Sequence, residues 1–207
     1  MNPRTPIAWP ARLLVVDVEG NGANPPDLVE VAALPIRDGR LDTTTAGAWL
    51  IRPPVPVTAF AAKVHGLTNE HLAQYPTWPE VRHGVREFLS DAWICAHNAH
   101  VDHRVLARHL PGWQPAGVID TLRLARATYP DAPAHSLDAL IEHAHLDLTH
   151  APAQRHRATY DAYATALLLL TMADLYETWP ELTAVAVPPG LPGAPKPPEP
   201  EQEPTLW

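Results

Sequence analysis

Residues 12–20 have the sequence R-L-L-V-V-D-V-E-G, an apolar run that ends in two carboxylates. Because Leu13 to Val16 are all apolar, the run predicts a strand buried on both faces of a sheet. Asp17 and Glu19 lie two positions apart at its end, and alternate side chains of a strand project from the same face. The stretch therefore predicts both a central strand and a pair of carboxylates that could hold a cation.

Other strands and helices are predicted outward from this run. Residues 28–36 and 48–51 are further strands, with Asp38-Gly39 between them as a hairpin turn, and residues 93–96 and 118–119 add two short strands. Helical periodicity predicts helices over residues 77–89, 101–110, 137–143 and 158–179, and Ser136 is the expected N-cap of the third. Antiparallel strands followed by alternating helices and strands predict an α/β fold, with a mixed five-stranded sheet and helices on both faces.

The length of 207 residues favours one domain with tails. We expect an N-terminal extension over residues 1–10, the main domain over 11–180 and a tail over 181–207. Eight of the 25 prolines fall between Pro188 and Pro204, which predicts an extended, disordered tail. Its last residues, 202–207, are either a short docking peptide for a replication partner or a disordered end.

Composition limits the classes of function. The single cysteine, Cys95, excludes an internal disulfide and a cysteine-based zinc site, and we interpret it as a buried strand residue. The chain shows neither a signal peptide nor a run of about 18 apolar residues, so we expect a cytoplasmic protein without a membrane partner. The formal charge of −8 argues against a broad phosphate-binding face, although carboxylates that surround metal ions also contribute negative charge.

Two later motifs add candidate catalytic residues. In A-H-N-A-H-V-D, residues 96–102, Asp102 falls in the first turn of a helix, where it is either a metal ligand or an acid that interacts with the helix dipole. In H-R-A-T-Y-D, residues 156–161, His156 precedes the long helix and Asp161 lies inside it, so the two can converge on one site. Each motif alone is weak, because the chain has 12 histidines and 23 acids.

Together and in this order, the three motifs resemble the DEDDh (DnaQ-like) 3'-to-5' exonucleases, and especially the branch of the proofreading epsilon subunit of bacterial DNA polymerase III. The resemblance spans residues 12–176. It is supported by V-E-V-A-A-L at 29–34, V-H-G-L-T at 64–68, I-D-T at 119–121 and H-S-L-D-A-L at 135–140.

The resemblance implies a ribonuclease H-like fold and a two-metal hydrolysis of phosphodiester bonds at single-stranded 3' ends, which releases nucleoside 5'-monophosphates. It implies Asp17, Glu19, Asp102 and Asp161 as ligands of two Mg²⁺ or Mn²⁺ ions, and His156 as the general base. DNA is the expected substrate ahead of RNA. A DNA polymerase or another replication or repair protein is the expected partner.

The residues expected to contact substrate are Val18, Gly20, Asn21, His65 and Asn98. The family commonly continues Asp-x-Glu with Thr-Thr-Gly, whereas this chain has Gly20, Asn21 and Gly22 and therefore lacks those hydroxyls, so backbone amides would have to bind the nucleotide. An aromatic residue that is usual before the third acid is replaced here by Val101.

Other readings of single residues and of the whole chain stay open. His65 is either a substrate-loop residue or a simple loop histidine, and Asp120 is expected to close a strand or cap a helix. Trp49, Trp78, Trp93 and Trp113 are expected to pack in the core and its rim. The alternative functions are a 3'-to-5' exoribonuclease, a catalytically silent module that binds nucleic-acid ends or partners, a small-molecule phosphodiesterase and a ribonuclease H-type endonuclease.

Overall fold

The computed structural model of the protein describes residues 7–152 and 154–194. Within these residues one mixed sheet has the strand order β3-β2-β1-β5-β6, and β4 also pairs with β2. Its six strands are β1 (Leu13–Gly20), β2 (Leu28–Arg37), β3 (Arg40–Leu41), β4 (Gly47–Leu50), β5 (Trp93–Ala96) and β6 (Gly117–Asp120). The predicted mixed α/β sheet is confirmed, but it has six strands and not five.

The additional strand arises from the way the chain leaves the predicted hairpin. Asp38 and Gly39 form the turn between β2 and β3, both with positive φ. Asp42 ends β3 after two residues, because its carboxylate accepts hydrogen bonds from the Thr44 N–H and from the hydroxyls of Thr44 and Thr45. The chain then forms a 3-10 helix, η1 (Thr43–Thr45), and returns to β2 as β4. Two short strands therefore share one edge of β2.

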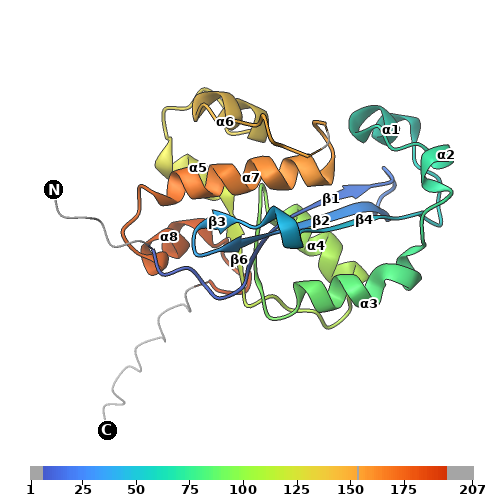
Figure 1. Ribbon diagram of the computed structural model, residues 1–207, viewed down its shortest axis with the longest axis horizontal. Coiled ribbons are helices and arrows are strands. Elements are labelled where there is room, and N and C mark those ends of the chain that lie inside the picture. The colour runs from blue at the N-terminus through green and yellow to red at the C-terminus, as the bar shows by residue number, and fades with distance from the viewer. Residues whose placement is uncertain (1–6, 153, 195–207) are drawn as a thin grey trace, which may run out of the picture.

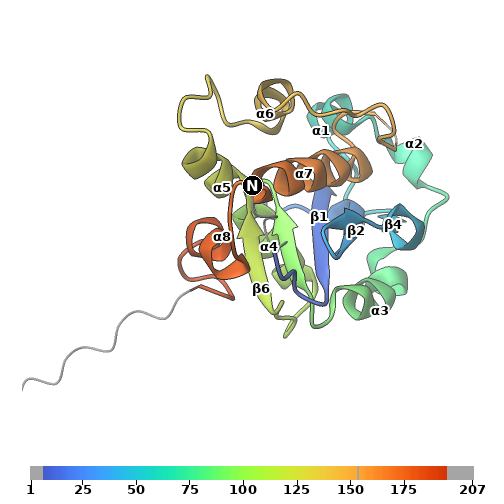
Figure 2. The ribbon, with the colours of Figure 1, turned by 60° about the vertical axis from the view of Figure 1, so that its left-hand side comes forward.

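The described residues form eight helices, which lie on both sides of the sheet and beyond one of its ends (Figures 1 and 2). They are α1 (Ala59–His65), α2 (Asn69–Leu72), α3 (Trp78–Leu89), α4 (His100–His109), α5 (Thr121–Thr128), α6 (Leu137–His143), α7 (Ala158–Ala173) and α8 (Trp179–Ala186). The predictions of α3, α4 and α6 are confirmed. The sequence did not predict α1, α2 or α5, and the helix predicted over 158–179 ends at Ala173, before α8 begins.

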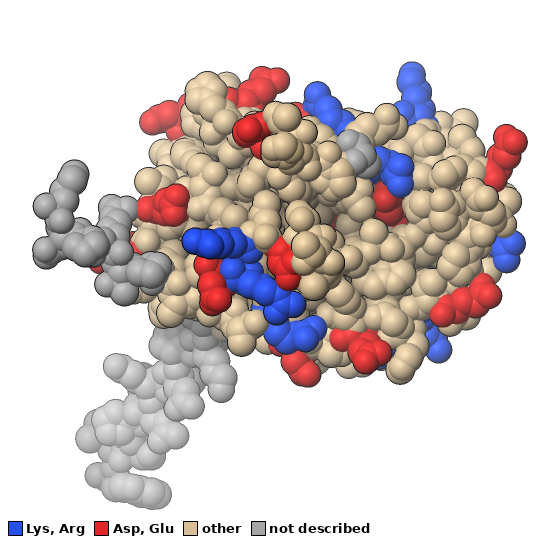
Figure 3. Space-filling model, in the orientation of Figure 1, with Lys and Arg blue, Asp and Glu red and all other residues tan. Residues whose placement is uncertain are grey.

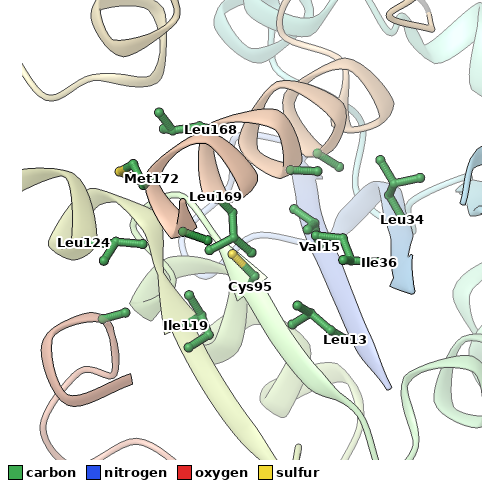
Figure 4. Packing of buried hydrophobic residues seen from close by; sticks show 14 of the residues in the cluster. Leu13, Val15, Leu34, Ile36, Cys95, Ile119, Leu124, Leu168, Leu169 and Met172 are labelled. Atoms are coloured by element: carbon green, nitrogen blue, oxygen red, sulfur yellow. The ribbon is translucent and has the colours of Figure 1, made fainter. Parts of the chain in front are cut away.

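The pleat of β1 divides the core into two layers. Leu13 and Val15 pack with α7 on one face, where Figure 4 shows Leu169 of α7 directed at the sheet. Leu14 and Val16 pack with α3 and α4 on the other face. Cys95 is buried in β5, as predicted. Since Asp17 and Glu19 continue the alternation of Leu13 and Val15, the same pleat directs both carboxylates to the α7 face.

The predicted domain boundaries need correction at the C-terminal side. Residues 181–194 were assigned to a disordered tail, yet α8 buries Leu182 and Ala186 in the core. Beyond α8, the N–H of Val118 in β6 donates to the carbonyl of Pro192 at 2.9 Å. The folded unit therefore extends to residue 194, and the predictions for the remaining tail, including the docking peptide over 202–207, lie outside the described residues.

The tryptophans pack within the protein, as the sequence predicted. Trp49 meets Phe88 edge to face at 5.4 Å between ring centroids, and the indole N–H of Trp113 donates to the carbonyl of Leu89. Trp78 likewise donates to a backbone carbonyl, and Trp93 stacks edge to face on another tryptophan. In the part of the chain that the structure describes, no helix has the length and apolar character needed to span a membrane.

Candidate active site

Three carboxylates converge where the carboxyl end of β1 meets the first turn of α7. Asp17 and Glu19 come from β1 and Asp161 from α7, and one oxygen from each lies within 4.8 Å of the others. Figure 1 shows the N-terminal end of α7 above the carboxyl end of β1. All three residues are half-buried. The predicted convergence of the first and third motifs is thus present in the structure.

Asp102 approaches the same strand end from the first turn of α4. The parallel pairing of β1 with β5 ends at Val15, which leaves the backbone of Val18 free on that side. The N–H of Val18 donates to the Asp102 carboxylate at 3.2 Å. Asp102 is 5% exposed and lies beside the group of three carboxylates, not within it. The four acids therefore border a single site.

The proximity of these acids and their burial change their acidity. Burial, together with the charges of Asp102, Glu19 and Asp161, raises the pKa of Asp17 well above its ordinary value. Burial and the charge of Asp161 raise the pKa of Glu19 to about 8. Burial also raises the pKa of Asp102 to about 7 and that of Asp161 to about 6. Without a cation, several of these carboxyl groups thus prefer to stay protonated near neutral pH.

His156 lies at the solvent side of the cluster. It is exposed and has a positive φ of 60°. Its charge lowers the pKa of the Asp161 carboxyl, against the larger effect of burial, which raises it. The predicted base therefore borders the acidic cluster on its open side.

The donor set fits divalent cations. Its ligands are carboxylate oxygens, which hard ions such as Mg²⁺ and Mn²⁺ prefer. Placing three carboxylates within 4.8 Å of one another is unfavourable unless a cation or protons offset the repulsion. Asp17, Glu19 and Asp161 would hold such an ion, with Asp102 beside them.

Asn21 organises the loop after β1. It is fully buried, its side-chain amide donates to Asp27 and to the carbonyl of Val55, and its side-chain oxygen accepts from the N–H groups of Ala23 and Asp27. Its backbone N–H donates to Asp27, and its carbonyl accepts from the N–H of Thr58. The polar groups of Asn21 therefore bind within the chain, and its contact with substrate stays a prediction.

His65 has a similar internal role. It is the last residue of α1 and is 2% exposed, so it is not a loop histidine. Its Nδ1 accepts from the N–H of Leu67 at 3.1 Å, so Nε2 carries the proton and donates to the carbonyl of Gly20 at 3.2 Å. His65 thus fastens the end of β1 to α1, and burial lowers its pKa.

The remaining predicted residues lie around the cluster. Val18 presents its backbone to Asp102 as described, and the tight approach of Pro26 to Gly20 leaves no room there for a side chain. Asn98 is exposed and adopts a left-handed conformation immediately before α4. Asp120 closes β6 and caps α5, as predicted, and accepts from the N–H groups of Asn98 and Leu122.

The sequence interpretation missed one buried ion pair beside the site. Glu30 of β2 is 2% exposed and binds the guanidinium of Arg157. An acid inside an otherwise apolar strand was a usable signal, because a buried carboxylate requires a partner. Nothing local to Glu30 indicated which residue that partner would be.

Comparison with known proteins shows the family of the chain. The chain matches the family described as Exonuclease over residues 14–169. It belongs to this exonuclease family. The match covers the elements that carry all four acids and His156, so the exonuclease resemblance drawn from the three motifs is confirmed. The chain is therefore a member of a family of nucleases, and this family uses divalent metal ions.

Several relatives of the chain are named as DNA polymerase III proteins. It is 36% identical over 183 residues to the PolC-type DNA polymerase III of Bacillus subtilis (strain 168), which corresponds to 81% of this chain and only 12% of that protein. It is 32% identical over 202 residues to the epsilon subunit of DNA polymerase III of Pasteurella multocida (strain Pm70), covering 88% of this chain and 78% of that subunit. The chain thus spans a small part of the PolC-type relatives.

A solved structure supports the fold of the chain. Exonuclease X, in complex with 5' overhanging duplex DNA, is similar with a TM-score of 0.67 and 31% sequence identity, over 79% of this chain and 92% of that chain. The fold is thus ribonuclease H-like, as predicted. On the face shown in Figure 3, basic side chains lie among acidic and uncharged ones. This agrees with the overall charge of −8, which favours contact with few phosphates.

Proposed function

We propose that this exonuclease removes nucleoside 5'-monophosphates from single-stranded 3' ends of DNA, with two Mg²⁺ or Mn²⁺ ions as cofactors. The observation that supports it best is the convergence of Asp17, Glu19 and Asp161 within 4.8 Å, next to Asp102 and His156. When bound, divalent ions would stabilise the charge that develops on the attacking and leaving oxygens. The chain's own residues supply the geometry and the proton transfer.

Each residue would have a distinct role in this reaction. Asp17, Glu19 and Asp161 would hold the cations in one place, and Asp102 would support the second ion from the α4 side. His156 would accept the proton of the attacking water, because it is exposed beside Asp161. Asn98 and the backbone near Val18 and Gly20 would contact the terminal nucleotide.

DNA is favoured over RNA as the substrate because DNA appears in the names of the two DNA polymerase III relatives and in the complex of exonuclease X. The epsilon subunit and the PolC-type protein are DNA polymerase components by name, and exonuclease X was solved with DNA. A DNA polymerase or another replication or repair protein is the proposed partner. An exoribonuclease is the alternative, because nothing in the described residues marks discrimination against a 2'-hydroxyl.

The test uses one 5'-labelled single strand made both as DNA and as RNA, with Mg²⁺ or Mn²⁺ and with a chelator as control. We expect a ladder that shortens from the 3' end, faster on DNA, and lost in the chelator and in Asp17→Ala and His156→Ala variants. Faster shortening of RNA would favour the alternative. No cleavage of either strand by the folded wild-type protein would reject the proposed activity and favour a silent binding module.

A further inference from the structure

The ion pair between Glu30 and Arg157 borders the acidic cluster without belonging to it. Glu30 lies in β2, directly opposite Glu19 of β1 in the antiparallel register. Arg157 is the N-cap residue of α7, 127 positions away in sequence. The pair therefore connects the centre of the sheet to the beginning of the helix that carries Asp161.

Three hydrogen bonds define this connection. The Nε and Nη2 atoms of Arg157 donate to the two carboxylate oxygens of Glu30 at 2.8 and 2.9 Å. The N–H of Ala158 donates to the same carboxylate at 3.1 Å. A two-pronged guanidinium–carboxylate contact fixes direction as well as distance. Two consecutive residues at the start of α7 are thus held against β2.

His156 immediately precedes these two residues. Its φ of 60° is uncommon for a residue with a side chain and persists only where the surroundings hold it. His156 lies close enough to Asp161 to influence its pKa, and the next residue, Arg157, is bound to Glu30. His156 therefore lies between the acidic cluster and the ion pair.

Glu30 itself is not placed to act as a cation ligand. Both of its oxygens bind Arg157, and one also binds the Ala158 N–H. The side chains are 2% exposed for Glu30 and 20% for Arg157, so removing either partner leaves a charge in a poorly solvated place. Such an interaction is suited to holding a segment in position.

We propose that Glu30 and Arg157 are positioning residues that set the location of His156 relative to Asp17, Glu19 and Asp161. This inference rests on the proposed exonuclease function. The pair acts through the backbone of residues 156–158 and does not touch the reacting atoms.

The test compares Glu30→Gln, Arg157→Met and Arg157→Lys with a matched control, Arg37→Met. The control removes an arginine from an exposed ion pair with Asp42, at the other end of β2. For each folded variant, kcat and KM are measured on labelled single-stranded DNA, and amide hydrogen exchange is measured over residues 156–160.

We expect Glu30→Gln and Arg157→Met to lower kcat about 10- to 100-fold, as other supporting residues of metal sites do. KM should stay close to the wild-type value, because substrate contacts are unchanged. Exchange should accelerate at residues 156–160 and not elsewhere. Arg157→Lys should retain part of the wild-type kcat, because lysine keeps the positive charge. The Glu30→Gln/Arg157→Met double variant should lose no more of kcat than either single variant does. Arg37→Met should have the wild-type kcat.

A wild-type kcat in the folded Glu30→Gln and Arg157→Met variants would overturn the inference, whatever their rates of amide hydrogen exchange. A lower kcat without faster exchange at residues 156–160 would also overturn it, because the pair would then act through its charge alone. Should Arg157→Met fail to fold, Arg157→Lys and Glu30→Gln provide the same comparison. A wild-type protein without nuclease activity would reject the proposed function, whereas the exchange data would still decide whether the pair holds this segment.

Discussion

The backbone N–H of Val18 donates to the carboxylate of Asp102 at 3.2 Å, although the two residues lie 84 positions apart. This bond joins the end of the central strand to the first turn of α4. It also lowers the pKa of Asp102, against the larger effect of burial, which raises it. The contact thus fixes the position of the fourth acid beside the other three.

The first prediction separates the charge of Asp102 from its hydrogen bond. Asp102→Asn keeps an acceptor for the Val18 N–H but removes the negative charge, so we expect an intact fold and a nuclease rate lower by about 100-fold or more. Asp102→Ala should also melt at a lower temperature, because it leaves the Val18 N–H unpaired. Thermal melts check the expected stabilities, and cleavage rates on labelled DNA check the expected loss of activity. Asp131→Asn, which alters an exposed acid elsewhere, is the control and should match wild type.

The second prediction concerns pH and metal. Glu19, Asp102 and Asp161 have folded-state pKa values of about 8, about 7 and about 6, all above their ordinary values. A carboxyl whose pKa is raised by folding stabilises the protein in its protonated form, so this stabilisation is lost as the pH rises through 6 to 8.

Melting temperatures in a chelator should therefore fall between about pH 5.5 and about pH 8. Mn²⁺ or Mg²⁺ should raise the melting temperature more at the upper end of this range, because cations bind the deprotonated carboxylates. A metal-induced shift that is equal at both pH values would contradict the assignment of these acids as ligands.

The third prediction distinguishes the general base from the metal ligands. His156→Ala should lower kcat by about 100-fold or more, within the range of general-base effects. It should preserve the metal-induced rise in melting temperature, because the carboxylates remain. His150→Ala, which changes another exposed histidine of the preceding loop, should leave the rate unchanged. Loss of the metal response in His156→Ala would point to a ligand role instead.

The fourth prediction tests the structural role of Asn21. Asn21→Ala removes the acceptor for two backbone N–H groups and should lower the free energy of unfolding by about 2 kcal/mol. Denaturant titration measures the change, and Gln74→Ala, at an exposed position, serves as the control. Unchanged stability accompanied by a raised KM would instead support the substrate contact first expected for Asn21.

The sequence alone was sufficient to predict the central strand, the acids at its end and the helices α3, α4 and α6. These features depend on local signals, because an apolar run, a helical period or a capping residue acts within a few positions of itself. The order of the motifs, with Asp17 and Glu19 first and Asp161 last, added a family resemblance. That resemblance carried the prediction of the fold and of the chemistry.

Only the tertiary structure decided which polar groups meet. Glu30 and Arg157 are 127 positions apart, and no local pattern pairs them. The sequence predicted that Asn21 and His65 contact substrate. In the structure, their side chains hydrogen-bond to backbone carbonyls of the chain itself. Sequence pattern predicts where an element begins and which face it buries, whereas the partner of a buried polar group depends on contacts between distant segments, which form only when the chain is folded.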